Sequence, residues 1–383
     1  MAIWATLATD EHVPAIAAFY REVWSREATP QSVLAARREA ARRNPAAPGE
    51  APPAALVFEG GRIIGYCGSI PQRLWDGTAE RPAYWVKGLM VLPEYRNGPI
   101  GFLVVKELAA WLPRSTILTV APAARRLFSA LGYTDLGVVS NFVRPLRPGT
   151  MARRVDFTEL GFASVPRWLR AGGRLVQRTG LATLAGATAG VAVDIAARTM
   201  RLAAGSLNAS GATGAPPATE LDDLWHRARA GLAASQVRDG CYLRGRFGQP
   251  GGPESNRYAF VTVRDAVGLA GVAVVRRPRV ERDPRLRGIR VATLSDIVFP
   301  AERADAGLAV LAGVERTARA AGGDAILCST SHRALARLLR RQGYFGAPPN
   351  LHFFLRDTTG ARWPQELGSW WLARGDAESD EIF

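Results

Sequence analysis

The sequence predicts an α/β protein built from two similar halves. Apolar runs of strand length alternate with segments of helical periodicity along the chain. A stretch rich in Ser, Gly, Ala and Pro, residues 206–220, separates the halves and has the composition of a flexible linker. The same order of segments occurs on both sides of it, which predicts two copies of one fold.

Each half starts with an arginine–proline loop and a hairpin of two apolar strands, with turns at Glu59–Arg62 and Arg264–Val267. A further strand ends at Pro93 in the first half and at Pro300 in the second. A helix, an apolar strand and a short helix that ends at Gly-Tyr follow in both. The predicted domains are residues 1–149 and 216–360, with a helical connector and linker over 150–215 and a Trp-containing acidic tail over 361–383.

The chain is basic, with a formal charge of +15 and a pI of about 10.8. Nearly all of this charge is arginine scattered through both halves, since Lys87 and Lys106 are the only lysines. This pattern argues against nucleic-acid binding and favours an anionic ligand or a membrane surface. Residues 165–205 are either a packed connector or a basic amphipathic element that rests on an anionic membrane.

The three cysteines, Cys67, Cys241 and Cys328, are odd in number and far apart, so no disulfide framework or zinc site is expected. The histidines are dispersed, which predicts no metal site. The N-terminus lacks the pattern of a signal peptide, and no apolar run is long enough to span a bilayer. We therefore expect a cytoplasmic protein, with peripheral contact to the inner membrane left open.

The segment VLPEYRNGPIG, residues 91–101, joins a predicted strand to a predicted helix through a turn with two glycines. The first N–H groups of a helix have no internal acceptor, and the helix dipole makes this end positive. A diphosphate suits such a turn. A glycine turn before a helix with no ligand is the alternative.

The order of elements and two motifs resemble the GNAT superfamily of N-acyltransferases. V-x-P-E-x-R followed by glycines is similar to the family signature that wraps the pyrophosphate of coenzyme A, and ARRLFSALGY is similar to a later family motif. The resemblance implies a mixed sheet in each of two tandem GNAT-like domains, and acetyl-CoA or another acyl-CoA as cofactor. It implies that Arg96 and Gly101 are the signature arginine and last glycine, and that the backbone of Leu89, Met90 and Val91 holds the pantetheine arm.

The signature departs from the family at Pro99, where a glycine is usual. We expect Pro99 at the first helical position, where its fixed φ is favourable. The N–H groups expected to face the diphosphate are those of Asn97, Gly98, Ile100, Gly101 and Phe102. In the second half Arg303 matches the signature arginine, but Asp305 would repel a phosphate. The second copy is therefore predicted to be degenerate and not to bind coenzyme A.

Acyl transfer to an amine needs a group that accepts the amine's proton, a hydrogen-bond donor to the developing oxyanion, and a proton for the leaving thiolate. The strand YWVKGLM has no carboxylate at the place where the resemblance implies a base, and Phe128 replaces the tyrosine that it implies as acid. The candidates that remain are Tyr84 and Tyr133, each of which could equally be a half-buried structural tyrosine, and Asp296 in the second copy. Lys87 could bind an acidic acceptor or be solvated, and Cys67 is expected to be an inert buried thiol.

The C-terminus, SWWLARGDAESDEIF, resembles the ends of tandem GNAT-like proteins from bacterial polysaccharide gene clusters. That resemblance points to the amine of a sugar or another small molecule as acceptor. Trp370 and Trp371 would stack on a sugar or, alternatively, anchor the tail. The prediction is an acyl-CoA-dependent N-acyltransferase with its active site in the N-terminal domain. The alternative is a catalytically degenerate GNAT pair that acts as a membrane-associated binding or scaffold protein.

Overall fold

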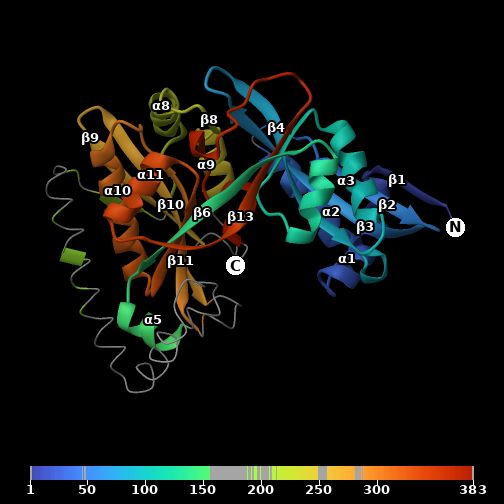
Figure 1. Cartoon of the computed structure of the whole chain (residues 1–383), viewed down its shortest axis with the longest axis horizontal. Helices are drawn as coiled ribbons and strands as arrows, with labels where there is room; N and C mark the ends of the chain where they lie inside the picture. The colour runs from blue at the N-terminus through green and yellow to red at the C-terminus, as the bar shows by residue number, and fades with distance from the viewer. Residues whose placement is uncertain are drawn as a thin grey trace. The chain divides into compact units, whose positions relative to one another are not determined.

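The fold is known from a computed structural model, which forms two compact units (Figure 1). Unit 1 comprises residues 1–137 and 351–365, and unit 2 comprises residues 138–350 and 366–383. The structure describes the following residues: 2–44, 46, 49–155, 188, 191, 194–195, 199, 207, 209–212, 214–248, 257–280, 286 and 288–381. The predicted basic connector, residues 165–205, therefore lies outside the described residues apart from isolated positions.

Unit 1 is a mixed sheet whose strands follow the order β1-β2-β3-β4-β5-β13. All neighbours are antiparallel except β4 and β5, which are parallel. The strands are β1 (Ile3–Leu7), β2 (Ala54–Glu59), β3 (Arg62–Trp75), β4 (Glu80–Val91), β5 (Arg114–Ile117) and the C-terminal part of β13 (Phe345–Asp357).

The predicted tight turn between β2 and β3 is present. Gly60 and Gly61 have φ angles of 55° and 84°. A two-residue hairpin turn with positive φ at both positions matches the twist of the strands, and glycine adopts it without strain.

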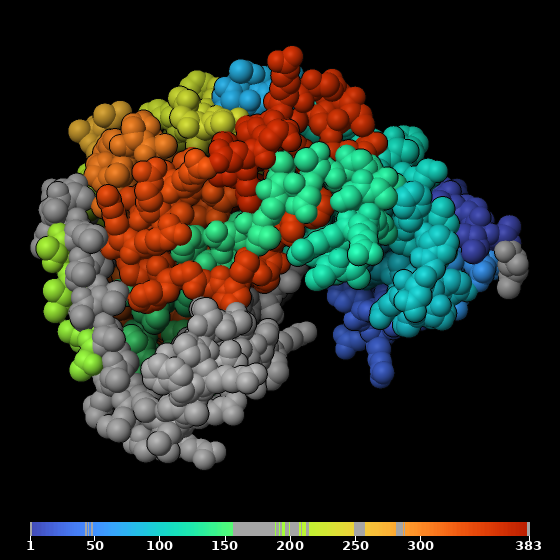
Figure 2. Space-filling view, viewed as in Figure 1, coloured from blue at the N-terminus to red at the C-terminus, as the bar shows by residue number. Residues whose placement is uncertain are grey.

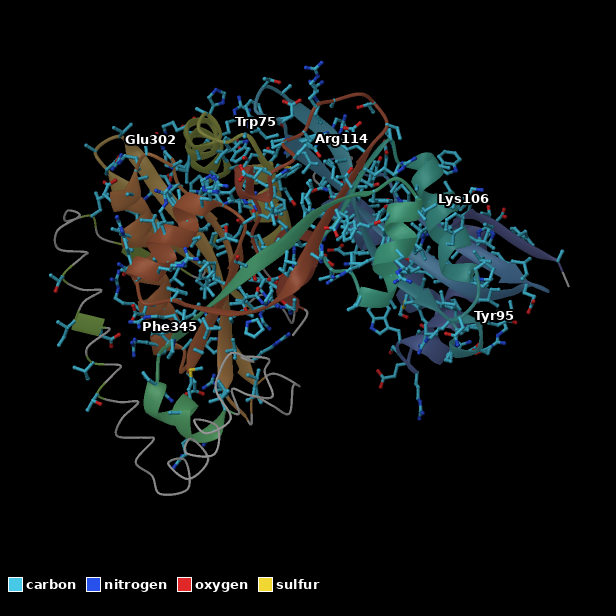
Figure 3. All side chains as sticks on the ribbon, in the orientation of Figure 1. Trp75, Tyr95, Lys106, Arg114, Glu302 and Phe345 are labelled. Carbon is cyan, nitrogen blue, oxygen red and sulfur yellow. The ribbon has the colours of Figure 1, made fainter. Side chains whose placement is uncertain are left out.

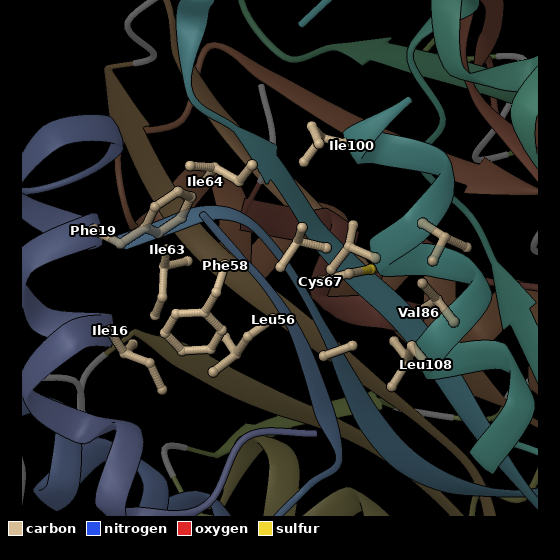
Figure 4. Packing of buried hydrophobic residues seen from close by; sticks show 14 of the residues in the cluster. Ile16, Phe19, Leu56, Phe58, Ile63, Ile64, Cys67, Val86, Ile100 and Leu108 are labelled. Carbon is tan, nitrogen blue, oxygen red and sulfur yellow. The ribbon is translucent and has the colours of Figure 1, made fainter. Parts of the chain in front are cut away.

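Helices cover both faces of this sheet. Figure 4 shows Ile16 and Phe19 of α1 on one side of the strands and Ile100 and Leu108 of α3 on the other. Gly65 in β3 allows this approach, because a Cβ there would lie 2.7 Å from a methyl carbon of Ile100. The helices of unit 1 are α1 (Val13–Val23), α2 (Pro30–Arg43), α3 (Ile100–Trp111) and α4 (Arg125–Ala130).

The strands of unit 2 also pair in a mixed arrangement, in the order β6-β12-β11-β10-β9-β7. Its hairpin, third strand, helix, parallel strand and short helix follow one another as they do in unit 1. Figure 2 shows the outer side chains of α10 and α11 in orange. The elements are α5 (Pro148–Arg154), β7 (Ala209–Ala212), α8 (Ala218–Arg229), β8 (Ala234–Gln236), α9 (Gly240–Phe247), β9 (Tyr258–Asp265), β10 (Gly268–Val280), β11 (Arg290–Val298), α10 (Ala304–Ala320), β12 (Ala325–Thr330), α11 (Arg333–Arg341) and β14 (Trp370–Trp371).

Each unit is completed by a strand from the other half of the sequence. In unit 1, residues 354–357 of β13 pair with β5. In unit 2, residues 140–145 of β6 (Thr134–Pro145) pair with β12. The last strand of each half thus belongs largely to the unit formed by the other half.

The predicted α/β class with a mixed sheet is confirmed. The compact units differ from the predicted domain ranges mainly because residues 351–365 belong to unit 1; the ranges themselves stay a prediction. Among the described helices, none is both long and apolar enough to cross a membrane.

Candidate functional site

The turn singled out in the sequence lies between β4 and α3. Pro93–Tyr95 form a short 3-10 helix, and the side chain of Arg96 turns back to donate from Nε to the carbonyl oxygen of Val91 at 3.3 Å. The turn is exposed from Asn97 to Pro99. Its backbone therefore lies at the surface where a ligand can reach it.

The start of α3 differs by one residue from the prediction. Leu103 donates its backbone N–H to the carbonyl of Pro99 at 2.9 Å. Pro99 is therefore the N-cap rather than the first helical residue. Since proline has no N–H group, this position adds no unsatisfied donor.

Unsatisfied donors do lie next to it. In the described part of the chain, the N–H groups of Asn97, Ile100, Gly101 and Phe102 have no hydrogen-bond acceptor. The N–H of Gly98 is different, because it donates to the carbonyl of Tyr95 at 3.0 Å. Four of the five predicted donors are thus available, and three of them form the first turn of a helix, where the dipole favours an anion.

The turn is held by side chains from β2, β3 and α1. Tyr95, labelled in Figure 3, donates its hydroxyl to Glu59. Arg62 pairs with Glu94 at 3.2 Å and with Glu22 at 2.6 Å. These are partly exposed contacts of modest individual strength, but together they fix the turn to the hairpin.

An opening between β4 and β5 leads away from this turn. The parallel pairing consists of Tyr84 with Ser115 and Trp85 with Thr116. β4 continues to Val91 without further pairing to β5. Among the described residues, no strand pairs with this edge of the backbone of residues 86–91, which is where the resemblance implies a pantetheine arm.

A β-bulge in β4 lies within this unpaired stretch. Gly68 pairs with Lys87 and Tyr66 with Met90, so β4 has one more residue than β3 between these pairs. Gly88 has a φ of 66°, which glycine adopts without a steric penalty. A bulge leaves backbone groups outside the regular ladder and re-aims them.

The predicted tyrosines lie in unit 1, near the closed end of the opening. The hydroxyl groups of Tyr133 and Ser115 are 2.8 Å apart, and both residues are buried. Burial raises the pKa of Tyr133 to about 12, so the phenol is neutral at ordinary pH. Tyr84 is half-buried on β4. Cys67 is fully buried and burial raises the pKa of its thiol to about 12, as expected of an inert thiol.

In unit 2 the corresponding helix end is already neutralised. Arg303 is the N-cap of α10 and pairs with Asp305 at 2.8 Å and with Asp265 at 2.9 Å. The hydrogen bond from Arg303, together with backbone N–H groups at this helix end, lowers the pKa of Asp305. A carboxylate thus already occupies the position where an anion would bind.

The opening of unit 2 is filled by the chain's own tail. The pairing of β11 with β12 ends at Leu294 and Cys328, and β11 has a bulge at Ser295. Gly375 donates its N–H to the carbonyl of Ser295 at 2.6 Å. On the other side, Ala373 forms an antiparallel bridge with Thr330, the last residue of β12. The tail therefore bonds to both strands where they separate.

Asp296, the third predicted catalytic residue, belongs to the buried contacts of this tail. Its Oδ1 accepts from Nε of Arg238 at 2.7 Å, and Arg238 also binds Asp376 of the tail at 2.8 Å. Burial raises the pKa of Asp296. The pairing favours a structural role for this carboxylate. Trp370 and Trp371 are fully buried beside it, which fits their predicted role as anchors.

A histidine that the sequence did not single out completes the polar residues of unit 1. Nε2 of His352 lies 2.5 Å from Oδ1 of Asp135. The ring is buried, and its Nδ1 has no hydrogen-bond partner in the described part of the chain. The residues around His352 in the sequence did not indicate this contact. It depends on the pairing of β13 with β5, which are more than 200 residues apart in the sequence. No cluster of His, Cys, Asp or Glu suited to a metal occurs among the described residues.

Comparison with known proteins supports the fold described above. Residues 13–133 match the model of the acetyltransferase (GNAT) family, which is less than half of the 383-residue chain. No curated protein matches the sequence.

Solved structures are similar over both units. A probable N-acyltransferase from Enterococcus faecalis aligns with a TM-score of 0.55 at 10% identity, covering 94% of this chain and 73% of that chain. A GCN5-related N-acetyltransferase from Anabaena variabilis aligns with a TM-score of 0.55 at 14% identity over the same shares. Saccharomyces cerevisiae N-myristoyltransferase with bound myristoyl-CoA aligns with a TM-score of 0.55 at 11% identity, covering 92% and 82%. At these identities the likeness concerns the fold.

Proposed function

We propose that this protein is an acyl-CoA-dependent N-acyltransferase whose active site lies in unit 1. One observation carries the proposal: β4 separates from β5 after Trp85, has a bulge in the unpaired stretch and leads to a helix end whose N–H groups have no acceptor among the described residues. The match of residues 13–133 to the acetyltransferase family covers this whole arrangement. The N-myristoyltransferase of similar fold was solved with myristoyl-CoA bound.

The residues present suit coenzyme A in two places. The N–H groups of Asn97, Ile100, Gly101 and Phe102 would bind the pyrophosphate, with Arg96 as a charged neighbour. The unpaired edge of Leu89, Met90 and Val91 would bind the amide groups of the pantetheine arm.

Unit 2 supports the second assignment by analogy. At the equivalent bulge, backbone amide groups of the tail around Gly375 bond to β11 and β12 where these strands separate. An opening between two parallel strands next to a bulge can therefore bind backbone amide groups. Unit 1 has the same design, and the tail belongs to unit 2.

Catalysis would rest mainly on positioning and on backbone hydrogen bonds. The bulge frees backbone N–H groups of β4 that can stabilise the charge developing on the thioester oxygen, without a special side chain. The hydroxyl of Tyr133 stays protonated and is a candidate proton donor to the thiolate. Tyr84 is the second candidate, on the strand that lines the opening.

Acetyl is the acyl group we propose, and the amine of a small molecule or a sugar is the proposed acceptor. Unit 2 is proposed to be a second, degenerate GNAT copy, in line with the Arg303–Asp305 pair and the filled opening. We propose a cytoplasmic location. The scaffold alternative rested on the altered loop at Pro99 and on the basic connector, residues 165–205. The loop keeps four available N–H groups, and the connector lies outside the described residues apart from isolated positions.

The test is acetyl-CoA consumption in the presence of a panel of amino sugars, amino acids and small amines. Wild type should release free coenzyme A with at least one of them. The matched variant Arg303→Ala should keep this activity, because Arg303 lies in unit 2. A protein that binds no acetyl-CoA and consumes none with any amine would contradict the proposal.

A further inference from the structure

In unit 1 the buried ring of His352 pairs with the exposed carboxylate of Asp135, and we call these two residues the dyad. Both residues belong to this unit, although His352 comes from β13 and Asp135 from the start of β6. The distance between Nε2 of His352 and Oδ1 of Asp135 is 2.5 Å. Asp135 also accepts the N–H of Gly137 at 2.8 Å, which holds the carboxylate in place.

The carboxylate determines which ring nitrogen carries the proton. An ionised carboxylate only accepts hydrogen bonds, so Nε2 must donate its proton to Asp135. Nδ1 of the neutral ring is then a free lone pair. This atom is buried and has no partner among the described residues, and the side chain as a whole is only 9% exposed. A buried polar atom without a partner requires an explanation.

The position of the dyad along the sheet supplies one. Thr116 pairs with Trp85, so three residues further along the parallel strands Thr119 is level with Gly88, the bulge of β4. Phe354 pairs with Ile117 in the antiparallel ladder, which places His352 opposite Thr119. The N–H of His352 donates to the carbonyl of Leu118 at 2.9 Å, so the ladder shifts by one residue here and His352 lies across from Leu118 and Thr119. His352 is therefore level with the bulge.

The side chain also lies on the face covered by α4. The ring centroids of His352 and Phe354 are 5.1 Å apart, and those of Phe354 and Phe128 are 6.3 Å apart. Phe128 belongs to α4 and stands where the family resemblance implies a tyrosine acid. β4 itself offers no carboxylate from Tyr84 to Val91. The dyad thus lies on the face and at the level where a proton acceptor is otherwise missing.

We propose that His352 is the catalytic proton carrier of the acyl transfer and that Asp135 is its positioning residue; this rests on the proposed function. The amine nitrogen forms a bond to the thioester carbonyl carbon, and the carbon–sulfur bond breaks. The proton lost by the nitrogen passes to Nδ1 of His352, and the imidazolium returns it to the coenzyme thiolate. Asp135 stabilises the imidazolium and keeps Nδ1 as the basic atom.

The first test needs no acceptor. In a protein with 15N-labelled histidine, the imidazole signal of His352 is assigned by its loss in His352→Gln. Saturation with acetyl-CoA should shift this signal and leave that of His226, exposed on α8 of unit 2, unchanged. Calorimetry on the same sample establishes whether acetyl-CoA binds. Absence of binding contradicts the proposed function, whereas binding with an unshifted His352 signal overturns the catalytic role.

The second test is kinetic. His352→Gln should bind acetyl-CoA as wild type does, melt at a similar temperature and lose at least 100-fold in kcat, since a positioned acid–base group typically contributes about 10²–10⁴-fold. Asp135→Asn should lower kcat by less than His352→Gln does and should leave the KM for acetyl-CoA unchanged, since it disturbs only the orientation of the imidazole. The control His226→Gln should match wild type. If His352→Gln retains wild-type kcat and the same pH profile, the dyad is structural and the proposal is wrong.

Discussion

The backbone N–H of Gly375 donates a 2.6 Å hydrogen bond to the carbonyl oxygen of Ser295, the residue at the bulge of β11. This contact fills in unit 2 an opening whose counterpart in unit 1 has no strand on one edge. Both units thus have a bulge in the third strand of the sheet, and in unit 2 the chain's own tail bonds to that strand where it separates from the next one.

The close approach at Gly375 gives the first prediction. A Cβ there would lie 2.7 Å from the carbonyl oxygen of Ser295 and 2.9 Å from the ring of Phe247. Gly375→Ala should lower the free energy of unfolding by about 1–3 kcal/mol, as overpacking does. The control is Gly346→Ala, where a Cβ meets nothing within 4 Å. Equal denaturant midpoints for the two variants would refute the account of the tail.

A second prediction concerns pH. Burial raises the pKa of Asp376 to about 6. Because this value lies above that of an aspartate in the unfolded chain, the group stabilises the fold at low pH, and that contribution is lost as the pH rises from about 4 to about 6. Asp376→Asn has no proton to lose in this range, so its stability should not fall between about pH 4 and pH 6 for this reason. Urea unfolding should therefore show the variant less destabilised, relative to wild type, at pH 7 than at pH 4.5. A larger relative loss at pH 7 would contradict the assignment.

The third prediction concerns the hydroxyl pair in the core of unit 1. Tyr133→Phe removes the partner of Ser115 and should cost about 1 kcal/mol of stability. Ser115→Ala should cost a similar amount, and the double variant less than the sum, because the two single changes remove one shared interaction. Strict additivity in thermal or urea unfolding would show that the two hydroxyls do not interact.

The fourth prediction concerns Gly101, in the first turn of α3. A Cβ at this position would lie 3.3 Å from a methyl carbon of Leu127 and 3.9 Å from a methyl carbon of Val91. A branched side chain would therefore press against α4 and β4 and displace the helix end with its N–H groups. Gly101→Val should weaken coenzyme A binding at least tenfold, about 1.4 kcal/mol.

Two controls accompany Gly101→Val. Gly101→Ala should lose less affinity for coenzyme A than Gly101→Val, because the end of the Leu127 side chain can move aside. Arg303→Ala should bind coenzyme A like wild type. If instead Gly101→Val binds normally and Arg303→Ala loses binding, the active site belongs to unit 2.

Local patterns predicted much of this structure. The Gly-Gly turn, the strand that ends before Pro93 and the helix that starts near Pro99 follow from turn chemistry and apolar periodicity, which act over a few residues. The family motif located the helix end in the same way. The departure at Pro99 is one residue, within the usual uncertainty of a helix boundary.

Contacts between distant parts of the sequence could not be predicted. The partner of β5 is β13, and apolar alternation in residues 351–357 does not say which strand it joins. The pairing of His352 with Asp135 follows from that strand and was therefore hidden. The partners of Asp296 were hidden for the same reason, because Arg238 comes from the loop before α9 and Asp376 from the tail.

The most direct test of the central claim is calorimetric titration of the full chain with coenzyme A. Unit 1 has an opening and free N–H groups among its described residues, whereas in unit 2 the tail and the Arg303–Asp305 pair occupy the equivalent places. The account predicts saturable binding with one coenzyme A per chain, weakened at least tenfold in Gly101→Val. No heat of binding up to millimolar coenzyme A would contradict it, and a stoichiometry of two would show that unit 2 is not closed.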